Sequence, residues 1–269
     1  MKTNQSTVEK QANKSFVVKL IITKDEIKKT HQQVLASIQA NFETKGFRKG
    51  KAPLDVVERE VSFEKLFEEV ASKLISQKYG EIIDENKLKP IIQPQVKFNK
   101  QIESFDQDWD IEISACEMPE ITLDKNYLDK IKKTKTESKA TDENQKTEEI
   151  VKTLISVAKV DLPQILIDSD VQHQLSHLVE QVQQAGITIE QYLANQKTNI
   201  KDYQENLKKK IVEEWTINLA IQKISVDQKI EVTPEEIKNI TDKNPALLQN
   251  INMVSYILIQ QKVFEFLKK

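Results

Sequence analysis

Glycine is the first scarcity in this chain: 269 residues contain only 4 glycines. The loops that cradle phosphates in nucleotide-binding enzymes depend on glycine, because the backbone must approach the ligand closely. No dinucleotide fingerprint, phosphate-binding loop or nucleophile elbow occurs in the sequence. We therefore predict that the protein is not an enzyme and uses no cofactor.

Cysteine and long apolar runs are also missing. The single cysteine, Cys116, excludes an internal disulfide, fits a reducing cytoplasm and is expected to be a small buried apolar residue. No run approaches the ~20 apolar residues of a membrane span. The first residues, Met1 to Ser6, lack the apolar core of a signal peptide. We therefore expect a cytoplasmic protein with no membrane partner.

Histidine occurs three times, at His31, His173 and His177. His173 and His177 lie four residues apart on a predicted helix, with Glu180 three residues further on, and such spacing can hold a metal. No acidic residue lies inside the pair in the metalloprotease pattern, and no cysteine is near. We interpret them as surface or cleft histidines and predict no metal site.

Charged residues are abundant, yet the formal net charge is only −2, so any attraction to nucleic acid must be local. It is concentrated in residues 44–53, which we call the basic loop and which read Thr-Lys-Gly-Phe-Arg-Lys-Gly-Lys-Ala-Pro. Two glycines and a closing proline predict a tight, exposed loop between helices, with Phe47 and Arg48 at its tip. An aromatic ring among cations suits a target with phosphates and flat or apolar surfaces. The alternative is a solvated basic turn whose Phe47 folds back into its own domain.

The elements around this loop are predicted from periodicity. A strand is expected over Ser15 to Ile22 and a helix over Lys24 to Phe42, begun by a capping box of Thr23 and Glu26. Two helices should follow the loop, over Leu54 to Glu60 and Phe63 to Asn86. The second carries a stripe that we interpret as core: Phe63, Leu66, Phe67, Val70, Leu74, Ile75 and Ile82.

Two further strands complete the first domain. They are expected over Gln95 to Asn99 and Asp108 to Cys116, the latter placing Trp109, Ile111 and Ile113 on one face. Residues 1–13 are polar and are expected to be frayed. These elements predict an α+β domain over residues 1–117.

Gly46-Phe47-Arg48-Lys49-Gly50-Lys51-Ala52-Pro53 resembles the ribosome-docking signature of the bacterial trigger factor family, and the order of elements around it matches too. The resemblance implies a ribosome-binding domain whose loop docks beside the exit tunnel, on a ribosomal protein and the adjacent ribosomal RNA. Phe47 would be an apolar anchor, Arg48 a forked charged contact and Lys49 a phosphate partner. The implied docking residues are Lys45, Gly46, Phe47, Arg48, Lys49, Gly50 and Lys51.

The sequence departs from the family after this domain. Most trigger factors insert an FKBP-type peptidyl-prolyl isomerase domain here, but the residues from Asp124 to Thr147 are too few and too polar for one. We therefore interpret residues 118–147 as a linker and the protein as a form that lacks the isomerase domain.

Residues 148–269 are expected to be entirely helical. Pro163 and Pro234 suit first helical turns, Gly186 a helix end, and Thr188 and Thr233 begin capping boxes. The resemblance implies a C-terminal chaperone domain whose arm-like helices enclose a cradle for unfolded chains. Candidate client contacts, each of which also fits the domain's core, are Leu175, Leu178, Val179, Val182, Ile187, Ile189 and Tyr192.

We interpret the protein as an ATP-independent chaperone that docks at the ribosomal exit tunnel and shelters nascent or unfolded polypeptides. The resemblance also allows a weak homodimer away from the ribosome. Three alternatives stay open: a ribosome-independent cytoplasmic holdase or assembly chaperone, a peptidyl-prolyl isomerase with an unrecognised site, and a general nucleic-acid-binding protein that uses the basic loop.

Overall fold

The computed structural model describes residues 6–138 and 142–269. The chain divides into two compact units, one up to Met118 and one from Pro119 onward. The first unit is a mixed α+β unit and the second is mostly helical, as the sequence predicts. Each unit is described by itself.

The first unit is built on a four-stranded antiparallel sheet in the order β1-β2-β4-β3. In the central pair Val18 lies opposite Ile113 and Ile22 opposite Trp109, and all four side chains are fully buried. Alternate residues of both strands face solvent, which gives the sheet one apolar face. The strands are β1 (Ser6–Lys10), β2 (Ser15–Ile22), β3 (Gln95–Phe98) and β4 (Trp109–Cys116).

Strand β1 corrects the prediction that residues 1–13 are frayed. Residues 6–10 pair with β2 along the whole of β1, while residues 1–5 lie outside the described residues. The pairing satisfies backbone groups that would otherwise form an open edge of β2. Val8 packs against the core, and Lys19 pairs with Glu9 at 2.7 Å. Hydrophobic patterning alone misses such a strand, because most of its side chains are polar.

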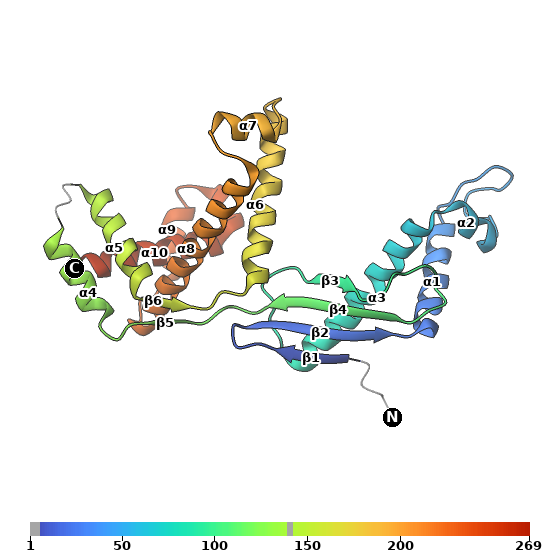
Figure 1. Cartoon of the computed structure of the whole chain (residues 1–269), viewed down its shortest axis with the longest axis horizontal. Coiled ribbons are helices and arrows are strands. Elements are labelled where there is room, and N and C mark those ends of the chain that lie inside the picture. Colours follow the sequence, from blue (N-terminus) through green and yellow to red (C-terminus); the bar gives the residue numbers. More distant parts are fainter. Residues whose placement is uncertain (1–5, 139–141) are drawn as a thin grey trace. The chain divides into compact units, whose positions relative to one another are not determined.

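Helices α1 (Lys24–Gln39), α2 (Leu54–Glu60) and α3 (Phe63–Asn86) complete the first unit (Figure 1). Buried side chains of all three helices join the core on the sheet. The predicted capping box of Thr23 and Glu26 is present. The bounds of α2 and α3 agree with the prediction, whereas α1 ends before Phe42. Phe63 was assigned to the core, but it lies at the first residue of α3 and is 36 % exposed.

The second unit contains seven α-helices among its described residues, together with a short antiparallel pair of strands, β5 and β6. The strand pair corrects the expectation of an entirely helical half. The elements are β5 (Ile121–Leu123), α4 (Tyr127–Glu137), α5 (Glu143–Val157), β6 (Ala158–Val160), α6 (Gln164–Gln184), α7 (Ile189–Asn195), α8 (Ile200–Asp227), α9 (Pro234–Thr241), a 3₁₀ helix η1 (Pro245–Asn250) and α10 (Ile251–Lys268).

The predicted arm is formed by α6, α7 and α8, with α7 joining the ends of the two long helices (Figure 1). Gly186, with φ +74°, follows the end of α6, and the capping box that begins at Thr188 starts α7. The indole N–H of Trp215 on α8 donates to Asp170 on α6 at 2.6 Å. The arm is therefore a closed pair of helices held by buried apolar residues and this hydrogen bond.

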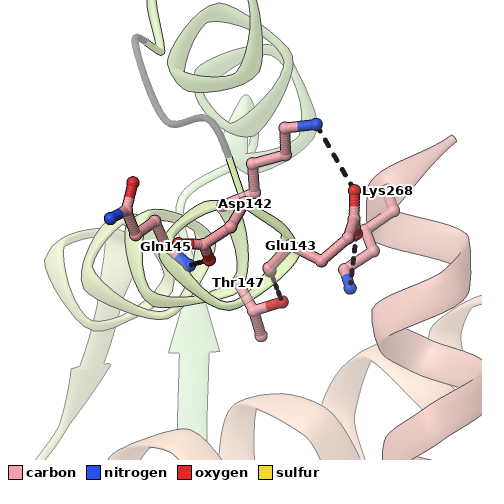
Figure 2. Close-up of polar contacts among 6 residues, drawn as sticks. Asp142, Glu143, Gln145, Thr147 and Lys268 are labelled. Carbon is pink, nitrogen blue, oxygen red and sulfur yellow. Dashed lines mark hydrogen bonds and ion pairs between the residues drawn. The ribbon is translucent and has the colours of Figure 1, made fainter.

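The region interpreted as a linker, residues 118–147, instead contains β5, α4 and the first turn of α5; residues 139–141 lie outside the described part. Within α4, Tyr127 and Ile131 lie one helical turn apart on the same side of the helix, and both are buried. Asp142 caps α5, and Glu143 accepts a hydrogen bond from Lys268 of α10 at 3.3 Å (Figure 2). That bond lowers the pKa of the Glu143 carboxyl, with Lys146 contributing next.

Neighbouring residues of β2 offer a matched test of the sheet. Ile22 is fully buried, whereas Ile21 is 47 % exposed on the opposite face. Ile22→Ala should lower the free energy of unfolding by about 2–5 kcal/mol, because it leaves a cavity in the core. Ile21→Ala should cost less than about 1 kcal/mol. Urea unfolding of both variants measures the difference, and equal losses would contradict the assigned face of the sheet.

Candidate functional site

The basic loop lies beyond the ends of α1 and α2 that point away from the sheet (Figure 1). Two successive turns shape it. The amide N–H of Phe47 donates to the Thr44 carbonyl at 3.2 Å, and that of Lys51 donates to the Arg48 carbonyl at 2.9 Å. Gly46 and Gly50 have φ values of +90° and +73°, which glycine adopts without strain. The glycine spacing in the sequence therefore sets the path of the loop.

Gly50 has a second role that only the structure reveals. Its N–H donates to the Phe42 carbonyl at 3.0 Å, which closes the loop at its base. A Cβ built on Gly50 would lie 2.9 Å from the carbonyl oxygen of Ala40, closer than real contacts allow, whereas at Gly46 it would meet nothing within 4 Å. The backbone at Gly50 therefore packs directly against the backbone at the end of α1, with no side chain between them.

Side chains fix the two ends of the loop to the core. The Gln39 side-chain amide donates to the Ala52 carbonyl at 2.7 Å, and Ala52 is buried at the core of the unit. Thr44 donates its hydroxyl hydrogen to Glu60 of α2 at 2.8 Å. The loop is therefore anchored on both sides and leaves only its middle in solvent.

The middle of the loop carries the predicted docking residues. Phe47 is 43 % exposed, and the cationic side chains around it are exposed as well. Within residues 6–138 and 142–269, no carboxylate forms an ion pair with any of these cations. An aromatic ring and uncompensated positive charge thus share one anchored loop; the cations are Lys45, Arg48, Lys49 and Lys51.

The predicted client contacts fall into two groups. Leu178 and Val182 are 8 % and 4 % exposed and belong to the buried face of α6, which fits the core alternative that the sequence left open for them. The other five are half-buried, along α6 and around the turn into α7: Leu175, Val179, Ile187, Ile189 and Tyr192. Helical spacing cannot separate these groups, because it does not say which face meets α8.

Several apolar side chains on η1 and α10, which sequence reasoning did not single out, are exposed. We refer to them together as the C-terminal apolar patch. Met253 is 60 % exposed and Leu248 is 55 % exposed. The sequence could have predicted this exposure. Apolar residues occur on every side of α10, whereas only part of the surface of a helix can face a core. The patch comprises Leu248, Ile251, Met253, Tyr256 and Ile257.

The three histidines lie on two helices, His31 on α1 and the other two on α6. His173 and His177 are exposed on α6 with ring centroids 5.9 Å apart. The described residues contain no group of three or more histidine, cysteine, aspartate or glutamate side chains that could hold a metal ion.

Cys116 is buried, as expected. Within the part of the chain that the structure describes, no helix is both long and apolar enough to cross a membrane.

The two loop glycines provide a matched pair of variants. Gly50→Ala should destabilise the first unit by roughly 1–3 kcal/mol, because the methyl group meets the Ala40 carbonyl and the positive φ is strained. Gly46→Ala carries only the backbone strain, about 1–2 kcal/mol or less. Urea unfolding and hydrogen exchange at the residue 50 amide measure both effects. A Gly46→Ala variant that is the more damaged of the two would contradict the loop geometry.

Family models match almost the whole chain. The model for the bacterial trigger factor protein matches residues 4–154, and the model for the trigger factor C-terminus matches residues 122–268. The two matches overlap over residues 122–154 and so leave no stretch for a domain inserted between them.

Individual relatives agree. The trigger factor of Bdellovibrio bacteriovorus is 32 % identical over 133 residues, which are 49 % of this chain and 30 % of that protein. The trigger factor of Staphylococcus aureus is 30 % identical over 118 residues, 44 % of this chain and 27 % of its own length. The aligned part of the chain thus spans less than a third of either relative.

A solved structure from work on promiscuous substrate recognition by the trigger factor chaperone, in its folding and assembly activities, shares the fold. Its TM-score is 0.60 at 11 % identity, over 97 % of this chain and 98 % of that one. With family models matching both halves, the chain belongs to the bacterial trigger factor family, in a form without the inserted isomerase domain.

Proposed function

We propose that this protein is an ATP-independent chaperone that docks at the ribosomal exit tunnel through the basic loop and shelters emerging polypeptides in the cytoplasm. The observation that carries the proposal is the loop itself. A ring and four cations are presented to solvent on a backbone that is fixed at both ends. A loop ordered before contact loses little conformational entropy on binding.

The chemistry of each side chain suits a surface made of protein and RNA. The guanidinium of Arg48 can form two parallel hydrogen bonds with a carboxylate or phosphate. Lys45, Lys49 and Lys51 are compact charges that suit single phosphates, and their contacts should weaken as salt rises. Phe47 supplies an apolar anchor in the middle of this charge.

The second unit would hold client chains. Newly made polypeptides expose apolar segments that aggregate. The C-terminal apolar patch offers exposed apolar side chains on a helical scaffold, and the half-buried residues around α7 offer a smaller second surface. Dispersed contacts of this kind hold a chain weakly and allow its release, which suits a chaperone that uses no nucleotide.

Proline isomerisation is not part of the proposed function. Residues 118–138 and 142–147, the described part of this region, form β5, α4 and the start of α5 and contain no separate domain. We expect no catalysis in an isomerisation assay on a proline peptide.

Replacing the loop's tip tests the docking site. The triple variant Phe47→Ala, Arg48→Ala, Lys49→Ala should lose at least about 90 % of co-sedimentation with ribosomes, because it removes the anchor and two of four cations. These side chains are exposed, so the unfolding curve should not change.

A matched control removes one exposed apolar residue and two lysines from another part of the first unit. Val96→Ala, Lys97→Ala, Lys100→Ala makes the same change of charge at β3 and should leave co-sedimentation unchanged. If both triple variants co-sediment with ribosomes as well as the parent does, the basic loop is not the docking site.

The C-terminal apolar patch is tested by its effect on aggregation. Leu248→Ser, Met253→Ser and Ile257→Ser together should raise by several-fold the amount of protein needed to suppress light scattering from a diluted, denatured enzyme, because they remove exposed apolar surface. Ribosome co-sedimentation should not change. A control with Gln249→Ser, Asn252→Ser and Gln261→Ser alters neighbouring exposed polar residues. If both variants suppress aggregation as well as the parent, clients bind elsewhere.

A further inference from the structure

The first unit contains an open depression of about 390 Å³ that the docking proposal does not use. It lies between α1, α2, the start of α3 and the connection from β3 to β4. Its walls combine aromatic rings with acidic side chains. The residues that matter here are Lys28, His31, Glu58, Phe63, Glu103, Phe105 and Asp106.

Stacked rings form the apolar part of this depression. Phe105 stacks on His31 with ring centroids 4.2 Å apart and an interplanar angle of 20°. Phe63 lies 5.1 Å from Phe105 and is 36 % exposed, although its position in the apolar stripe of α3 predicts burial. Phe63 also stacks on Phe67 at 6.1 Å, so the depression keeps part of an aromatic cluster exposed to solvent. The electron-rich rings of such a cluster attract cations.

Three carboxylates line the depression around these rings, and only one lysine lies among them. Lys28 pairs with Asp106 at 2.7 Å, and this hydrogen bond lowers the pKa of the Asp106 carboxyl. Glu103 is exposed, and within the described residues no cation forms an ion pair with it. The Glu58 side chain is half-exposed, and its contact is with His31.

His31 does not compensate Glu58. Its Nε2 lies 3.5 Å from Glu58 Oε1, yet it has no hydrogen-bond partner among the described residues, and the side chain is only 10 % exposed. Burial lowers the pKa of His31 below its usual value, and the nearby Glu58 charge raises it by a smaller amount. The imidazole is therefore neutral near pH 7, and Glu58 and Glu103 leave the depression negative.

We propose that this depression binds an arginine or lysine side chain from a basic segment of a partner protein. A guanidinium or ammonium group would lie against the exposed part of Phe63, beside Phe105, and donate hydrogen bonds to Glu58 and Glu103. The same carboxylates repel phosphate, which excludes RNA as the occupant. The basic loop selects the opposite charge, so this site does not depend on the loop's role.

Binding should be linked to the protonation of His31. A cation beside Glu58 offsets the negative charge that raises the His31 pKa, so binding should lower that pKa further. By reciprocity, protonating His31 should weaken binding as the pH falls below about 6.5. The other charged groups that face the depression are Glu58, Glu103, Asp106 and Lys28, and the charge of Lys24 also acts on Asp106.

The experiment is an NMR titration of the full chain with N-acetyl-arginine amide, followed on the ring signals of Phe63, Phe105 and His31. We expect saturable shifts, and none with the citrulline analogue, which has nearly the same shape without the charge. The double variant Glu58→Gln, Glu103→Gln should weaken binding about tenfold or more. The matched pair Glu81→Gln, Glu85→Gln, which changes exposed carboxylates further along α3, should bind like the parent.

Three results would overturn the proposal. They are equal binding of the citrulline analogue, equal loss in the two double variants, and a His31 pKa that stays constant at saturation with the arginine derivative. Amide spectra of the variants that match the parent outside the depression establish that each is folded. Ribosome co-sedimentation of the same variants separates this site from the basic loop.

Discussion

The pairing of β2 with β4 is the constraint on which the first unit depends. Its fully buried side chains fill the apolar face of the sheet, and the two strands fix where the neighbouring elements begin. Helix α1 starts directly after β2 at the Thr23 cap and ends beside the basic loop. Gly50 and Ala52 then return the chain against α1 and the core. The position of the exposed basic loop thus depends on the buried side chains of β2 and β4, which lie at the other end of α1.

The first unit presents two surfaces of opposite charge. The basic loop offers cations around Phe47, whereas the depression at His31 offers carboxylates around Phe63 and Phe105. Helix α2 joins them, since it begins one residue after the loop and carries Glu58. The two proposals together describe a unit suited to a target that combines phosphate with basic protein. The formal net charge of −2 sums over the whole chain and therefore does not reveal either surface.

Much of the fold could be predicted, for reasons that particular residues make plain. Helix α3 was predicted correctly because its apolar stripe follows the helical period, and the capping boxes at Thr188 and Thr233 marked the starts of α7 and α9. Strand β1 was missed because backbone pairing, rather than apolar side chains, holds it. The burial of Leu178, the exposure of Phe63 and the C-terminal apolar patch depend on which elements meet in space, and periodicity does not contain that information.

The central claim, that the basic loop contacts the ribosome, is tested most directly by crosslinking. A photoreactive p-benzoylphenylalanine would replace Phe47 in one variant and Val96, exposed on β3, in another. After irradiation with ribosomes, the label at position 47 should attach to protein or RNA at the tunnel exit, and the label at position 96 should give little product. Crosslinks from position 96 without any from position 47 would contradict the account.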